Sequence, residues 1–198
     1  MSYDKFRESM SIAELVEVLL GFLEDVFGRD FLVKGLELLK KKPRGRVEEY
    51  QYLREVNVHR AVRWYCLLKT FRDRGYRFDL RFSVEVREFM NLMIFYYTFK
   101  HLLDKSIVDL SSRNVQGRLH GDPGQFDDFT HEVLVASNYA SNNFRTEMPD
   151  ASGSGIVDVY AEKGSIKIWC ECKRIRREEV YNNIVIELLR WLHKKNLI

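Results

Sequence analysis

The sequence lacks three features that would set it apart from an ordinary globular protein. It has only three cysteines, an odd and small number that argues against a disulfide framework and favours a reducing, cytoplasmic setting. No apolar run reaches the roughly 18 residues that a membrane-spanning helix needs, since the longest, FMNLMIFYYTFKHLL at 89–103, is interrupted by Asn91, Lys100 and His101. The first ten residues contain acids and no apolar core, so they do not resemble a secretory signal. We therefore expect a cytoplasmic protein with no membrane partner.

A strong charge of one sign is also absent. The formal net charge is +3, which alone says little about partners. Local basic clusters say more: Lys40–Lys42 with Arg44 and Arg46, FRDRGYRFDLRF at 71–82, and KRIRR at 173–177. Such clusters either contact nucleic-acid phosphates or belong to a solvated surface of mixed charge, and the sequence leaves both interpretations open.

The first 110 residues have the pattern of helices. Ser11 followed by Glu14 is typical of a capping box, and apolar residues then recur at helical spacing over 12–27. Gly28 is expected to end this helix. Further helices are predicted over 31–39, 47–74 and 83–103. The aromatic residues of the last one are expected to fill the core rather than line a ligand site.

The pattern changes at about residue 111. The stretch SSRNVQGRLHGDPGQ at 111–125 is polar, contains three glycines and a proline, and is predicted to be a linker or loop. The elements predicted after it are a helix at 126–140, a strand at 143–148, a loop at 149–155, two strands at 156–161 and 166–173 joined by a turn at Gly164, and a closing helix at 180–195. No internal repeat or low-complexity tract is visible.

The last two predicted strands each carry charge at their centre. Because side chains alternate along a strand, Asp158 shares one face with Tyr160, and Glu171 shares one face with Trp169 and Lys173. If the hairpin pairs them, Asp158 and Glu171 converge beside Lys173. Two carboxylates and a lysine suit a hard divalent cation and phosphodiester hydrolysis. The alternative is a surface ion pair worth less than about 1 kcal/mol.

These residues resemble the core motif of the PD-(D/E)xK nuclease superfamily. Asp158, twelve intervening residues and then Glu171-Cys172-Lys173 are most similar to the patterns of archaeal Holliday-junction resolvases and Mrr-type restriction endonucleases. The resemblance covers about 120–198 and implies a restriction-endonuclease-like α-β-β-β-α core. We therefore expect an α+β chain, with an all-helical N-terminal domain at 1–110 followed by the nuclease core at 120–198.

The resemblance also implies roles for individual residues. Asp158 and Glu171 would bind the metal, the backbone carbonyl of Cys172 would be a further ligand, and Lys173 would orient the attacking water. Glu132 suits the acid that the family often adds from the preceding helix, with Asp127 and Asp128 as rivals. The literal Pro149-Asp150 pair competes with Asp158, which is favoured because a ligand needs rigid backbone. Ser152 and Ser154 fall in the loop that lies near the scissile phosphate in the junction resolvases, or are ordinary turn residues.

The sequence departs from the family at its end. The usual core has a fourth strand after its second helix, whereas only Asn196-Leu197-Ile198 follow the predicted closing helix. Cys170 and Cys172 resemble a zinc pair, but they fall on the apolar face of their strand, which favours packing.

The sequence therefore predicts a Mg²⁺-dependent DNA endonuclease, with Mn²⁺ as an alternative ion and a homodimer as the form that would cleave both strands. Two other interpretations remain open. One is a catalytically silent nucleic-acid-binding or assembly module that keeps the fold, and the other is a nuclease acting on RNA.

Overall fold

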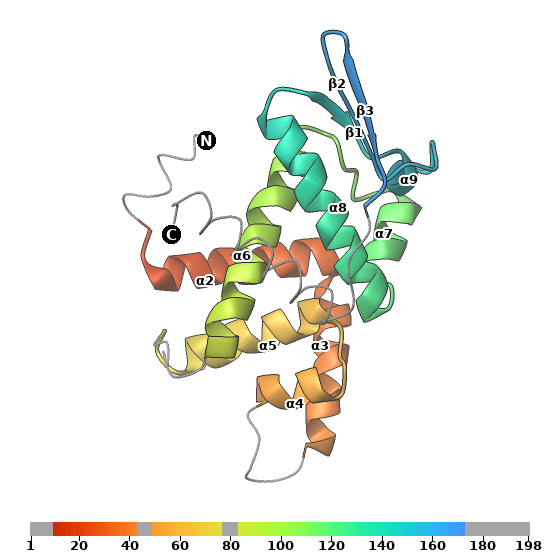
Figure 1. The fold of residues 1–198 in the computed structure, drawn as a ribbon. Helices are drawn as coiled ribbons and strands as arrows, with labels where there is room; N and C mark the ends of the chain where they lie inside the picture. The colour runs from red at the N-terminus through yellow and green to blue at the C-terminus, as the bar shows by residue number, and fades with distance from the viewer. Residues whose placement is uncertain (1–9, 43–48, 77–82, 173–198) are drawn as a thin grey trace, which may run out of the picture.

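The computed structural model describes residues 10–42, 49–76 and 83–172, in which helices form most of the molecule and one small sheet lies at one end beside α8 (Figure 1). The helices are α2 (Ile12–Phe27), α3 (Arg29–Leu36), the short 3₁₀ helix η1 (Glu37–Lys41), α4 (Glu49–Glu55), α5 (Arg60–Asp73), α6 (Ser83–Asp104), α7 (Arg113–Leu119), α8 (Pro123–Ser141) and α9 (Pro149–Ser152). The strands are β1 (Arg145–Glu147), β2 (Val159–Lys163) and β3 (Ile166–Cys170). The chain is therefore an α+β protein, as predicted.

The first helix forms as its sequence predicts. The Ser11 side chain accepts a hydrogen bond from Glu14 N, and the Glu14 carboxylate accepts one from Ser11 N at 2.7 Å, which completes the capping box of α2. Gly28 ends the helix with a positive φ of 76°, a conformation that glycine adopts without strain.

The single helix predicted over 47–74 is wrong, because the described chain breaks between α4 and α5. Asn57 takes a positive φ of 52°, which a continuous right-handed helix does not allow. His59 then caps α5, and its Nδ1 accepts a hydrogen bond from Ala61 N at 3.2 Å. The helical periodicity continues through the break, so it concealed the turn.

The loop predicted over 111–125 is also wrong, because it contains α7 and the first residues of α8. Val115 and Leu119 are fully or almost fully buried, so α7 is held by the core rather than by helix propensity. Asp122 caps α8 by accepting hydrogen bonds from Gly124 N and Gln125 N. The helix predicted over 126–140 therefore begins three residues earlier, at Pro123.

An aromatic core joins the two parts of the chain. The Phe126 ring on α8 lies 5.5 Å from the rings of both Phe27 and Phe95. The Phe129 ring lies 6.1 Å from that of Phe99 on α6. The aromatic residues of α6 therefore fill the core, as predicted, and one buried cluster runs from α2 to β2.

The strands form an antiparallel sheet in the order β1-β2-β3, and the β2–β3 hairpin extends away from the helices (Figure 1). Gly164 makes the turn with a positive φ of 59°. Val159 and Ala161 are buried on the face that lies against α8, while Tyr160 pairs with the exposed Trp169 on the outer face. The predicted alternation of faces is confirmed within β2. The closing helix predicted at 180–195 lies outside the described residues.

Within the described ranges, no helix combines the length and the apolar character that crossing a membrane would require.

Candidate active site

Asp158 lies at the open end of the hairpin, but not inside a strand as predicted. β2 begins one residue later, at Val159, because the chain before it bonds elsewhere: Val157 O accepts a hydrogen bond from Asp150 N at 3.1 Å. The Asp158 carboxylate turns across the hairpin and accepts a hydrogen bond from Cys172 N at 2.5 Å. This hydrogen bond therefore links the end of β3 to the start of β2 and fixes the position of the Asp158 side chain.

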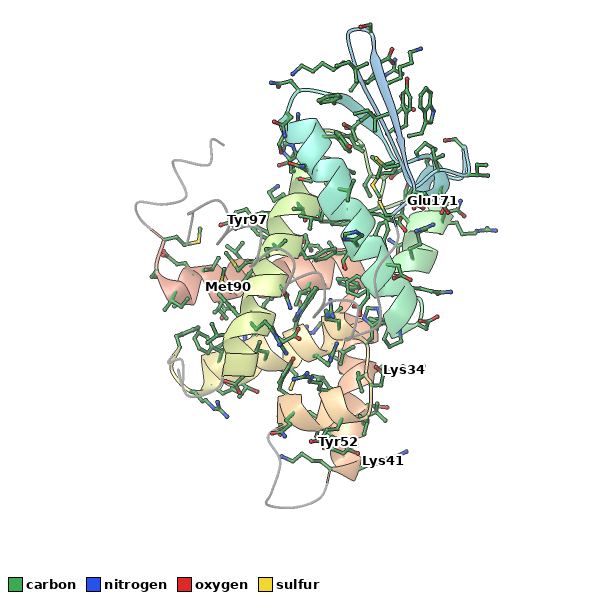
Figure 2. The ribbon with its side chains drawn as sticks, in the orientation of Figure 1. Lys34, Lys41, Tyr52, Met90, Tyr97 and Glu171 are labelled. Atoms are coloured by element: carbon green, nitrogen blue, oxygen red, sulfur yellow. The ribbon has the colours of Figure 1, made fainter. Side chains whose placement is uncertain are left out.

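Glu171 directly follows β3 and is exposed. Figure 2 places it at the lower end of the hairpin, where the sheet meets the helices. The last ladder pair is Val159 with Cys170, so Asp158 and Glu171 are the next residue on each strand beyond that pair. The structure thus brings both acids to the same end of the hairpin. Lys173 lies outside the described residues, as does the KRIRR segment.

Glu132 is buried on α8, with a side chain only 6% exposed. Arg118 on α7 donates hydrogen bonds to both of its oxygens, at 2.9 and 2.7 Å. Burial raises the pKa of the Glu132 carboxyl, Arg118 partly lowers it, and the negative charges of Asp158 and Asp128 raise it again. Glu132 therefore lies within electrostatic reach of Asp158, where the predicted helix acid belongs.

Cys172 is influenced by the charges of the same two acids. Burial raises the pKa of its thiol to about 11, and the charges of Asp158, Glu132 and Cys170 contribute in that order. Its side chain is half-buried beside the core, on the face predicted for it. Cys172 thus remains a thiol at neutral pH, and its backbone is the part available for ligand chemistry.

The rival acids separate into two groups. Asp127 forms an ion pair with Arg60 of α5 at 3.0 Å, which directs it toward the helical core. Asp128 and Asp150 line one pocket together with Glu132. Asp150 also forms an ion pair with Arg118. Asp128 is therefore the rival acid that shares the surroundings of Glu132.

That pocket lies beside α7, α8 and α9 and has a volume of about 580 Å³. Apart from Gly117, its lining residues are polar or charged: Arg113, Asn114, Arg118, Gln125, Asp128, Glu132 and Asp150. Sequence reasoning missed the contribution of α7, because this helix was predicted to be a linker. A single arginine in a polar stretch gives no indication, in the sequence alone, that its side chain will pair with two acids far away along the chain.

The serine side chains of the Gly-Ser loop at 152–155 mainly form hydrogen bonds within their own turn. Ser152 Oγ lies 2.8 Å from Ser154 Oγ and donates to Pro149 O at 3.0 Å. Gly153 has a positive φ of 76°, and a Cβ atom there would collide with the Asn114 side-chain amide. Hence glycine is required at 153, and these contacts favour the turn interpretation of the two serines.

The acids near the hairpin end offer the oxygen atoms that a divalent cation prefers, but Arg118 donates to both oxygens of Glu132. Asp158 and Glu132 supply carboxylate oxygens, which Mg²⁺ prefers, and the Cys172 backbone adjoins Asp158. Burial is the main cause of the raised pKa of Glu132, and the charges of Asp158 and Asp128 are smaller contributions that a bound cation would offset. No cluster of three or more His, Cys, Asp or Glu side chains arranged to hold a metal occurs among the described residues.

Comparison with known proteins found no matching family model, no similar curated protein and no similar solved structure.

Proposed function

We propose that this chain is a metal-dependent endonuclease that hydrolyses phosphodiester bonds of DNA, with a restriction-endonuclease-like core. The observation that carries the proposal is the meeting of Asp158 and Cys172 N at 2.5 Å at the hairpin end, within electrostatic reach of buried Glu132. The order of helix, strand and hairpin supports it, because α8, β1, β2 and β3 follow the predicted order.

Each residue would have a separate task. Asp158 and Glu132 would hold Mg²⁺ or Mn²⁺ through carboxylate oxygens, the Cys172 carbonyl would add a neutral ligand, and Glu171, the predicted second ligand, would reach the ion through a coordinated water. The bound ion would supply polarisation of the phosphodiester and a lowered pKa for a coordinated water. Lys173 would orient that water and stabilise the charge that develops on the phosphate.

Asp158 is assigned as the ligand in preference to Asp150. Asp158 is fixed by a backbone hydrogen bond across the hairpin, whereas Asp150 is neutralised by the Arg118 guanidinium. Glu132 has the same Arg118 partner, so the preference for Asp158 rests on its hydrogen bond at the hairpin end and not on the charge of Arg118.

DNA is the proposed substrate because a basic segment, KRIRR at 173–177, directly follows Cys172 in the sequence. We also propose that two copies associate, since cleaving both strands of a duplex requires two sites, and that the enzyme acts in the cytoplasm.

A catalytically silent nucleic-acid-binding module is the second candidate. The observation that favours it is the Arg118 guanidinium, which engages both Glu132 oxygens where a metal would otherwise bind. A nuclease acting on RNA would use the same residues as the first proposal.

The proposal is tested by incubating the protein with plasmid, branched and single-stranded DNA and with RNA, in Mg²⁺, Mn²⁺ or EDTA, and measuring cleavage. Asp158→Asn retains an oxygen that can accept from Cys172 N but loses the charge, so it is expected to reduce cleavage at least about a hundredfold without unfolding. Lys173→Ala is expected to lose turnover and retain DNA affinity. Glu162→Gln, on the outer face of β2, is the matched control. Cleavage that persists in EDTA or in Asp158→Asn would reject the proposal, and nucleic-acid binding without cleavage would favour the silent module.

A further inference from the structure

The described sheet has an open edge at β3. This strand pairs with β2, and no other strand of residues 10–42, 49–76 and 83–172 borders it. The hairpin extends away from the helices, which leaves the edge accessible along its length (Figure 1). A sheet edge with apolar side chains readily pairs with a strand of another chain, and soluble proteins usually protect such edges. The edge of β3 is therefore a candidate interaction surface.

The backbone of β3 directs alternate residues toward this edge. The turn at 164–165 has two residues, and the first strand pair after it contains Ile166. In such a hairpin the pair beside the turn is hydrogen-bonded, and bonded pairs then alternate along the strands. Every second residue from Ile166 onward therefore bonds to β2. The residues between them, Lys167, Trp169 and then Glu171, direct their N–H and C=O groups toward the open edge.

The outer face of the sheet presents an aromatic side chain among charges that are already paired. Trp169 is 61% exposed, and its ring lies 5.5 Å from the Tyr160 ring. The charged side chains of this face pair with one another: Arg145 with Glu147 at 2.8 Å and Lys167 with Glu162 at 3.8 Å. An exposed aromatic residue beside paired charges suits a protein interface better than a phosphate backbone, which requires unpaired cations.

The edge is also complementary to itself. Lys167, Trp169 and Glu171 alternate with the inward residues and so share the outer face. An antiparallel copy of the strand centred on Trp169 places Lys167 of each copy opposite Glu171 of the other, with the two Trp169 rings adjacent. In this register the outward N–H and C=O groups meet as an antiparallel ladder requires. The contact of Lys167 with Glu162 is long and exposed, so it leaves Lys167 able to approach a second acid.

We propose that β3 pairs with β3 of a second copy of this chain, antiparallel and centred on Trp169, so that two three-stranded sheets become one continuous sheet. One short strand from each copy is a small contact, so the expected dissociation constant is on the order of 10 µM. The inference adds a contact surface to the association proposed above, and it requires neither a bound metal nor cleavage.

Sedimentation velocity of the full chain in EDTA, from about 1 to 100 µM, tests the pairing. Lys167→Glu places acid opposite acid and Glu171→Lys places lysine opposite lysine, so each variant alone is expected to dimerise at least about tenfold more weakly than wild type. An equimolar mixture of the two variants restores both charge pairs and is expected to form a heterodimer about as tightly as wild type. Arg145→Glu makes the same change of charge on β1, at the other edge of the sheet, and is the matched control.

Trp169→Cys is the second variant, which decides the question if the charge variants do not fold. In the proposed register the two new thiols face each other, so mild oxidation is expected to give a disulfide-linked dimer. Tyr160→Cys, one strand further from the edge, measures the background from the native cysteines and is expected to stay monomeric in a denaturing gel.

A wild-type protein that stays monomeric at the highest concentration would overturn the inference, and so would a dimer that neither charge variant weakens. Charge variants that dissociate but do not associate when mixed would overturn it as well, because the proposed register requires the mixed pair to form. Cleavage, and its loss in Asp158→Asn, tests the proposed activity separately from all of these outcomes.

Discussion

His59 shows how burial sets the charge state of a single residue. Its ring is 8% exposed and lies 4.6 Å from the Phe126 ring and 5.2 Å from the Phe31 ring. Its pKa is lowered to about 4, mainly by burial and to a smaller extent by the positive charges of His120, Arg63 and Arg60, against a smaller opposing effect of Asp122. The ring is therefore neutral at pH 7, with Nδ1 serving as the cap of α5.

This burial predicts a pH dependence of stability. Between about pH 6.5 and pH 4 the unfolded chain protonates His59 and the folded chain does not, so the free energy of unfolding falls as the pH is lowered through this window. The loss reaches about 3 kcal/mol and stops below pH 4, where both states are protonated. The His59→Asn variant would keep a cap acceptor that does not titrate.

Urea unfolding of wild type and His59→Asn from pH 4 to pH 8 measures the effect. The difference in stability between the two proteins should change by about 3 kcal/mol across the window and stay constant above pH 7. Parallel curves for the two proteins would show that His59 is not responsible.

At the residue scale the candidate site was predictable only where its members belong to a local motif. Asp158, Glu171 and Cys172 follow from the hairpin pattern, and Glu132 follows from its place on the preceding helix. Arg118 was not predictable, because its ion pairs join residues 14 and 32 positions away in the sequence and depend on how α7 packs.

At the scale of elements, Gly35 on α3 packs closely against the Val62 side chain on α5. A Cβ atom on Gly35 would lie 2.5 Å from Val62 Cγ2, and Val62 is almost fully buried and stiff at its branched Cβ. A Cβ atom on Gly21, in the middle of α2, would meet no described atom within 4 Å.

The surroundings of the two glycines therefore predict opposite effects of a glycine-to-alanine substitution on the stability of the protein. Gly35→Ala is expected to destabilise the protein by about 1–3 kcal/mol because the helices must move apart. Gly21→Ala is expected to stabilise it by up to about 1 kcal/mol because alanine favours the helix. Thermal and urea unfolding measure both, and the same sign for both variants would contradict the described α3–α5 packing.

Local signals also explain which elements could be predicted. α2 and α6 have caps or long periodic patterns, so their sequences alone define them. The break at Asn57 and the helix α7 depend on tertiary contacts of buried residues such as Val58, Val115 and Leu119. No short-range pattern distinguishes α7 from a polar loop.

At the scale of the whole molecule, the core runs across the predicted boundary between 1–110 and 120–198. Phe126 and Phe129 are fully buried by rings from α2, α5 and α6, which belong to the first segment. The two-domain division remains a prediction about organisation, and this shared core indicates that the second segment depends on the first.

Expression of residues 120–198 alone tests that dependence. Without Phe27, Trp64 and Phe95, the fragment would expose a large apolar surface, so it is expected to lack a cooperative unfolding transition. The full chain is expected to unfold in one transition in calorimetry. A fragment that melts cooperatively would show that the two segments are independent domains.

The central claim is that the hairpin end and α8 together hold a divalent ion through Asp158 and Glu132. The most direct test is a Mn²⁺ titration of wild type, Asp158→Asn and the control Glu162→Gln, with binding followed by electron paramagnetic resonance. Wild type and Glu162→Gln are predicted to bind Mn²⁺ saturably. Asp158→Asn is predicted to bind Mn²⁺ at least about tenfold more weakly. Equal Mn²⁺ binding in all three proteins, or none in wild type, would contradict the claim.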